Sequence, residues 1–249
     1  FFAKKILIDL SLSSSAADWI VLASYFCRKK IFSSLITGPL SKTLIKKSGY
    51  NFVGHTGLFK KMFPQSKLFM GFLGKDFNVL LATDHIPINQ VEKSLTRSVV
   101  RSALNASLHF RSLINSKKKI AVLGLNPHAG ESGTIGKEEQ EIINPICEKL
   151  RANGIDCTDA LPADSAFSLF NRQKYDAYVA MYHDQGLIPI KALDFWGGVN
   201  VTLGLPIIRT SPDHGTGYEI AGKNIANPQS FINALKTAHL MAQNRHMYG

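Results

Sequence analysis

Three histidines in this sequence each follow a short apolar segment of the kind that forms a buried strand. They are His85, His128 and His183, and separations of 43 and 55 residues exclude a local zinc finger. Neutral imidazole is a common ligand for zinc-like ions, and three histidines with open coordination positions are typical of a catalytic metal site. The pattern therefore indicates a shared metal ion. Three separately solvated loop histidines are the alternative.

His55 and Thr56 lie between two glycines, in a segment that we expect to be a turn. At such a position an imidazole, a hydroxyl and backbone N–H groups can all donate hydrogen bonds to an anion. The two residues are therefore candidates for binding a negatively charged substrate. An ordinary turn without a ligand is the alternative interpretation.

Lys191, Asn200 and Arg209 follow the last of the three histidines at intervals of eight or nine residues. Asn200 and Arg209 lie in an otherwise apolar segment, and burying an amide or a guanidinium is unfavourable unless it has a partner. A carboxylate or phosphate ligand would satisfy both groups, and a phosphate suits the two-pronged guanidinium. An internal ion pair between Arg209 and Asp213 is the alternative.

Short apolar strands alternate with helical segments along the chain. We expect strands, each running into a turn or loop, within residues 32–37, 78–88, 118–130, 175–186 and 197–217. We expect helices over residues 16–30, 41–49, 91–114, 137–154 and 228–245. This alternation predicts an α/β fold with a mostly parallel sheet, in which ligands bind at the carboxyl ends of the strands.

The charge of the chain says little about its partners. It has 29 Lys and Arg against 18 Asp and Glu, a net charge of +11 over 249 residues. The basic residues form short, scattered clusters at predicted helix ends and turns, where cations favour the helix carbonyls. A nucleic-acid-binding protein usually gathers them on one face, so we expect no nucleic-acid partner.

Other features of the composition bear on location and cofactors. No apolar run reaches 18 residues, so we expect no membrane partner, and Asp9 interrupts the apolar opening segment that a signal peptide would need. Three widely spaced cysteines indicate a reducing compartment, and we expect a cytoplasmic location. Neither a GxGxxG segment after a strand nor a GxxxxGK[ST] loop is present, so no standard nucleotide-binding motif occurs.

Longer motifs follow one another in a characteristic order: LITGPLSK, GHTG, ATDHIP, GLNPHAGESG, LPADS, AMYHDQGL and GVNVTLGLPIIRTSPDHGT. In these motifs the sequence, from about residue 20 onward, resembles the 4-hydroxythreonine-4-phosphate dehydrogenase family. The resemblance implies an isocitrate/isopropylmalate-dehydrogenase-like α/β fold with two domains around a cleft. It implies a partial first domain of residues 1–50 plus 222–249, and a second domain of residues 51–221 that carries most of the metal and substrate site.

The resemblance also implies a reaction. Enzymes of this family serve pyridoxal phosphate biosynthesis and oxidise 4-phosphooxy-L-threonine with NAD or NADP, releasing 3-amino-2-oxopropyl phosphate and carbon dioxide. They act as homodimers with the active site at the interface and need a divalent metal ion such as zinc, magnesium or cobalt. A related dehydrogenase of 4-phosphorylated threonate or erythronate, and an inactive homologue with an incomplete first domain, are the alternatives.

Carried over position by position, the resemblance assigns the metal to His85, His128 and His183. It assigns substrate contacts to five residues: His55, Thr56, Lys191, Asn200 and Arg209. It also implies catalytic roles for Lys191 and for two acids in polar family motifs, Asp164 and Asp184.

The sequence departs from the family in two places. Gly57 stands where the family has Glu, and the family begins with a GDPAGIG-like strand-turn-helix that this sequence does not contain. We therefore expect an incomplete first domain that leaves a sheet edge and apolar surface uncovered. Cofactor binding is the function that this departure affects most.

Overall fold

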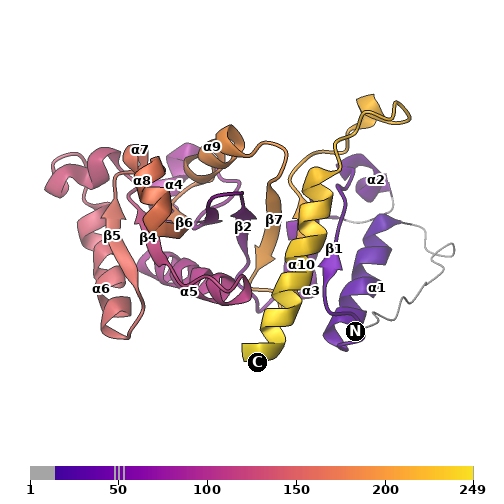
Figure 1. The fold of residues 1–249 in the computed structure, drawn as a ribbon, viewed down its shortest axis with the longest axis horizontal. Coiled ribbons are helices and arrows are strands. Elements are labelled where there is room, and N and C mark those ends of the chain that lie inside the picture. The colour runs from indigo at the N-terminus through magenta and orange to yellow at the C-terminus, as the bar shows by residue number, and fades with distance from the viewer. Residues whose placement is uncertain (1–14, 48, 50, 53, 249) are drawn as a thin grey trace.

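The computed structural model describes residues 15–47, 49, 51–52 and 54–248, and every structural statement below refers to them. Their strands form one 8-stranded sheet in the order β1-β8-β7-β2-β3-β6-β4-β5, which runs across Figure 1 from β1 at one edge to β5 at the other. The strands are β1 (Leu35–Ile36), β2 (Phe69–Leu73), β3 (Asn78–Leu81), β4 (Lys119–Leu123), β5 (Cys157–Leu161), β6 (Tyr175–Ala180), β7 (Val199–Leu203) and β8 (Arg209–Pro212).

The helices connect these strands and cover both faces of the sheet. They are α1 (Ala16–Arg28), α2 (Lys42–Lys47), α3 (Gly54–Met62), α4 (Ile88–Ser94), α5 (Arg97–Leu113), α6 (Asn144–Ala152), α7 (Ala163–Ala166), α8 (Leu169–Lys174), α9 (His183–Leu193) and α10 (Gln229–Tyr248). Three further turns are η1 (Pro127–Gly133), η2 (Glu139–Ile143) and η3 (Tyr218–Ile220). Within the described part of the chain, none of these helices is long and apolar enough to cross a membrane.

The sheet is mixed. Adjacent strands in the series β3, β6, β4 and β5 are parallel, and β1 is parallel to β8. Strand β2 is antiparallel to both β3 and β7, and β7 is antiparallel to β8. The sequence pattern did not reveal β2. A tight connection joins it to β3, in which Gly74 N–H donates to the Phe77 carbonyl over 3.0 Å, and so short a connection permits only antiparallel pairing.

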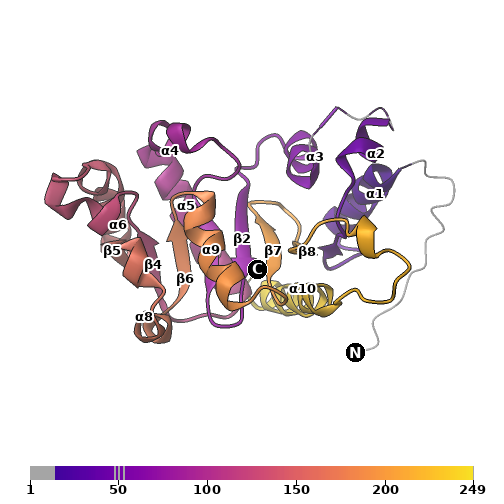
Figure 2. The ribbon, with the colours of Figure 1, turned by 90° about the horizontal axis from the view of Figure 1, so that it is seen from above.

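Alternate residues of the central strands belong to two different apolar cores. On β3, Leu80 packs with α5 and α10, whereas Val79 and Leu81 pack with Leu187 of α9 on the opposite face. This is the period of two that a strand buried on both faces requires. Figure 2 shows α10 on one side of β7 and β8 and α1, α2 and α3 on the other.

Several predicted boundaries differ from the observed ones. The predicted helix 91–114 is two helices, because the Thr96 side chain accepts a hydrogen bond from Val99 N–H and caps a new helix start. The predicted turn at His55 and Thr56 is the first turn of α3, and the predicted loop after His183 is the start of α9. As a result four candidate residues, His55, Thr56, His183 and Asp184, lie in the first turns of these two helices.

The predicted division into two domains remains a prediction. Strand β1 belongs to the predicted first domain and β8 to the second, and the two strands pair in parallel with Leu35 opposite Arg209. Strand β1 lies at one edge of the sheet, and the neighbouring helix α1 exposes Trp19 and Tyr25, which are 45% and 52% exposed.

Candidate active site

A cavity of about 1140 Å³ opens beside β7 and β8, and a neighbouring cavity of about 370 Å³ shares part of its wall. The larger cavity is lined by six of the predicted residues: His55, Thr56, His85, Lys191, Asn200 and Arg209. The smaller cavity adds His183 and Asp184. The fold therefore gathers eight of the ten predicted residues, from elements that are far apart in the chain.

Arg209 is the most deeply buried of these residues, at 4% exposed. Its Nε and Nη2 both donate to Thr37 Oγ1 over 3.1 and 2.6 Å, and its Nη1 donates to Asn200 Oδ1 and Thr202 Oγ1 over 3.1 and 3.0 Å. Four of its five N–H groups are thus bonded to neutral oxygens. Burial lowers the pKa of Arg209 to about 9, which leaves the guanidinium charged at neutral pH.

No carboxylate pairs with Arg209 within the part of the chain that the structure describes. The alternative ion pair with Asp213 is wrong, because the Asp213 carboxylate lies 2.5 Å from Lys191 Nζ, which also donates to the Asp213 carbonyl over 2.8 Å. A buried cation whose only partners are neutral favours an anionic ligand.

His55 lies near this cation and is held neutral mainly by its burial. Burial, and to a lesser extent the charge of Arg209, lower the pKa of His55 to about 3. Its ring stacks on Phe59 with centroids 6.5 Å apart, and its Nε2 is buried without a hydrogen-bond partner among the described residues. A neutral imidazole with an unused ring nitrogen suits hydrogen bonding to a phosphate oxygen.

We expect His55 to make the stability of the chain depend on pH. Between pH 6.5 and the folded pKa of about 3, the unfolded chain takes up a proton at His55 that the folded chain does not. Acidification over this range therefore lowers the free energy of unfolding, by at most about 1.4 kcal/mol per pH unit. The His55→Asn variant should lose this part of the slope in denaturant melts, whereas a variant of the exposed His239 should keep it. Equal slopes in all three proteins would contradict the assignment.

Two of the three predicted metal ligands lie together. The rings of His85 and His183 have centroids 5.2 Å apart, and Asp184 Oδ1 lies 2.7 Å from His183 Nδ1. A carboxylate on Nδ1 leaves Nε2 of His183 free, which is the arrangement that orients a metal-binding histidine. The chemistry of this pair of imidazoles and its supporting carboxylate suits two of the ligand positions of a divalent ion.

His128 does not complete this pair. Over the residues described, no group of three His, Cys, Asp or Glu side chains could hold a metal ion. His128 follows β4, which is separated from β3 by β6, and it lies in a left-handed run that continues through Ser132. Buried Glu139 anchors this turn by accepting hydrogen bonds from the backbone N–H groups of Leu125 and Asn126 over 2.7 and 2.8 Å.

Asp164 also lies outside the two cavities, exposed in the first turn of α7. Conversely, the sequence did not identify Thr37 and Thr202 as partners of Arg209, nor Asp213 as the partner of Lys191. Thr37 ends a strand immediately before a Gly-Pro pair. That position marks a strand end but does not reveal a contact 172 residues away.

The fold defines the class of protein first. The described chain superposes on isocitrate dehydrogenase from Methylococcus capsulatus with a TM-score of 0.50, at 16% identity over 86% of this chain and 68% of the other. A mixed α/β sheet of this kind is the isocitrate-dehydrogenase-like fold. The predicted fold class is therefore confirmed.

The particular family follows from closer relatives. The chain belongs to the family of the pyridoxal phosphate biosynthetic protein PdxA, whose sequence profile matches residues 9–238. It is 49% identical to the 4-hydroxythreonine-4-phosphate dehydrogenase of Sulfurihydrogenibium sp. (strain YO3AOP1) over 220 residues, 87% of this chain and 67% of that protein. The crystal structure of 4-hydroxythreonine-4-phosphate dehydrogenase from Klebsiella pneumoniae superposes with a TM-score of 0.80, at 35% identity over 92% of this chain and 70% of that one. The chain thus spans about two thirds of the length of these relatives.

Proposed function

We propose that this chain acts as a metal-dependent dehydrogenase that oxidises 4-phosphooxy-L-threonine with NAD or NADP and releases 3-amino-2-oxopropyl phosphate and carbon dioxide. One observation carries the proposal: a buried, charged Arg209 with only neutral partners shares a cavity with His55, Lys191 and His85. The names of the relatives supply the substrate and the dehydrogenation, and the family resemblance supplies the cofactor and the products.

Each group in the cavity has a role in this proposal. Arg209 and neutral His55 bind the substrate phosphate, with Thr56 and Asn200 as further donors. Lys191, held in place by Asp213, is the catalytic group that holds or removes a proton at the substrate hydroxyl. The cavity of about 1140 Å³ exceeds the volume of a phosphorylated four-carbon acid, which supports a second ligand such as a nicotinamide nucleotide beside it.

His85 and His183 of one chain would hold a divalent ion, with Asp184 orienting His183. When bound, such an ion lowers the pKa of a substrate hydroxyl and stabilises negative charge on oxygen. Because His128 of the same chain lies apart from this pair among the described residues, we propose that His128 of a second copy completes the site. This gives the homodimer a function, since neither copy has a complete set of ligands.

Mixing two inactive variants tests the shared site. Dimers of His128→Ala and dimers of His183→Ala each lack a ligand in both sites, whereas a mixed dimer has one intact site. After unfolding and refolding together we expect about a quarter of wild-type activity, from statistical reassortment of a symmetric dimer. A mixture as inactive as its components, with mixed dimers verified by mass spectrometry, would contradict a site shared in this way.

The three cysteines, Cys27, Cys147 and Cys157, are all free and buried. Free thiols support the cytoplasmic location that the sequence suggests.

The substrate is tested by turnover of the purified chain. Formation of reduced nicotinamide is followed with 4-phosphooxy-L-threonine and with 4-phosphorylated threonate or erythronate, each with NAD and NADP and with zinc, magnesium or cobalt. We expect the amino acid to give the higher kcat/KM. A preference for either hydroxy acid would identify a related dehydrogenase, and absence of nicotinamide binding by calorimetry would identify an inactive homologue.

A further inference from the structure

We propose that Thr37 is a positioning residue that orients the Arg209 guanidinium toward the anion in the cavity. The inference deepens the proposed function, since it concerns the anion site of the same cavity. Thr37 Oγ1 accepts two of the hydrogen bonds of Arg209, from Nε over 3.1 Å and from Nη2 over 2.6 Å. The shorter contact is also the shortest that the guanidinium makes.

The backbone fixes Thr37 beside Arg209. Strand β1 pairs in parallel with β8, and Thr37 N–H donates to the carbonyl of Thr210, the residue after Arg209, over 3.1 Å. Thr37 and Arg209 are each 4% exposed, so water has little room to replace the hydroxyl. The backbone hydrogen bond and the burial therefore hold the Thr37 hydroxyl in place as an acceptor for Arg209.

The other acceptors hold only one end of the guanidinium. Asn200 and Thr202 accept from Nη1, whereas Thr37 accepts from the Nε and Nη2 edge. Together these contacts use four N–H groups and leave one, on Nη2, for a ligand. Without the Thr37 hydroxyl, the Nε and Nη2 edge loses its acceptor and the remaining donor loses its fixed direction. The positive charge stays in the cavity, but the free N–H group of Nη2 is no longer held toward the ligand.

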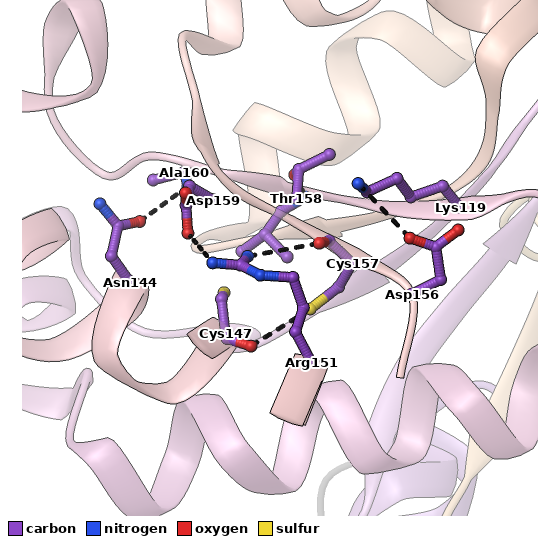
Figure 3. A network of polar contacts seen from close by, with 10 residues as sticks. Lys119, Asn144, Cys147, Arg151, Asp156, Cys157, Thr158, Asp159 and Ala160 are labelled. Carbon is purple, nitrogen blue, oxygen red and sulfur yellow. Dashed lines mark hydrogen bonds and ion pairs between the residues drawn. The ribbon is translucent and has the colours of Figure 1, made fainter. Parts of the chain in front are cut away.

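Isosteric variants separate positioning from stability. Thr37→Val keeps the shape and removes the acceptor, and Thr37→Ser keeps the acceptor. Thr158→Val is a matched control. Thr158 (Figure 3) is 6% exposed, and its Oγ1 accepts a hydrogen bond from Val122 N–H over 2.9 Å. It belongs to the edge strand β5 and lines neither cavity. Both valine variants lose one buried threonine acceptor and should lose comparable melting temperature.

The probe is inorganic phosphate, measured by isothermal titration calorimetry on the full chain. We expect Thr37→Val to weaken phosphate binding about tenfold, because the hydrogen bond from the charged Arg209 to the anion becomes poorly oriented. Thr37→Ser and Thr158→Val should bind phosphate as the wild type does. With the phosphorylated substrate, Thr37→Val should raise KM more than it lowers kcat.

A double variant checks that Thr37 acts through Arg209. In the Arg209→Met background the Thr37→Val change should cause no further loss of phosphate affinity, because the guanidinium that Thr37 orients is absent. If Thr37→Val does not fold, Thr37→Cys, whose sulfur is a weak acceptor, takes its place with the same expected direction.

The outcomes are distinct. Unchanged phosphate affinity in Thr37→Val, or an equal loss in Thr158→Val, would overturn the role of Thr37 while leaving the proposed function intact. Phosphate binding by the wild type without turnover of any of the substrates tested would instead overturn the dehydrogenase, and the Thr37 comparison would still decide the positioning role. A wild-type chain that does not bind phosphate would overturn both.

Discussion

Arg209→Lys is expected to raise the KM for the phosphorylated substrate and to lower kcat/KM by roughly ten- to hundredfold. Lysine keeps a positive charge in the cavity but cannot reach Thr37, Asn200 and Thr202 together while also presenting a donor to the ligand. The lost interaction corresponds to about 1.5–3 kcal/mol, the range for hydrogen bonds to charged groups. KM and melting temperature are measured on the same preparation, and metal content should not change.

Arg151→Lys is the matched control. Arg151 donates to Asp159 over 2.8 Å and to the Cys157 carbonyl, in the network of Figure 3. It lines neither active-site cavity, so its replacement should leave KM unchanged. A normal KM in Arg209→Lys, accompanied only by a lower melting temperature, would remove Arg209 from the site.

The structure also changes what the sequence implied about this contact. The sequence predicts a phosphate bound by two N–H groups of the guanidinium. Four of the five N–H groups are already bonded within the protein, so we expect one direct hydrogen bond to the anion, supported by charge. The other phosphate oxygens are then left for His55 and neighbouring donors in the cavity.

His183→Ala is expected to have the second large effect, a loss of divalent-metal affinity of at least about a hundredfold, with activity lost in parallel. The variant removes one of the two imidazoles that lie 5.2 Å apart. Asp184→Asn keeps the ligand but weakens its orientation, and we expect a smaller loss, on the order of tenfold, because supporting carboxylates typically affect affinity to that degree. Metal stoichiometry after dialysis is measured by elemental analysis and affinity by calorimetry with Co²⁺.

His239→Ala serves as the control for this series, because His239 is exposed on α10 and lines neither cavity. It should bind Co²⁺ as the wild type does. Unchanged stoichiometry and affinity in His183→Ala would show that the histidine pair is not a metal site.

Much of the fold could be predicted from local pattern. The alternation of strands and helices identified the α/β class, and the strand that ends in Leu81 and the helix that begins near Gln229 lie close to where periodicity placed them. Strand β2 was not predicted because FMGFL is a short apolar run without clear alternation. Its antiparallel pairing depends on the neighbouring strands rather than on its own residues.

The residue types of the site were also readable from the sequence. Histidines follow β3, β4 and β6, and an arginine lies in an apolar segment, where its burial is unfavourable without a partner. Eight of the ten candidates line the two cavities. Their partners were not readable. Thr37 meets Arg209 across 172 residues, and Lys191 rather than Arg209 takes the carboxylate of Asp213.

The sequence by itself determined most of the helices and strands and which side chains need a polar partner, because helix and strand periods and the cost of burying a charge are local properties of a chain. Only the tertiary structure decided which residues are the partners of these polar side chains. Strand order places β1 beside β8 and β6 between β3 and β4. It thereby brings Thr37 to Arg209 and His183 to His85, while His128 stays apart. Strand order is set by the burial of whole faces against one another, a balance over the entire core that no short stretch of residues contains.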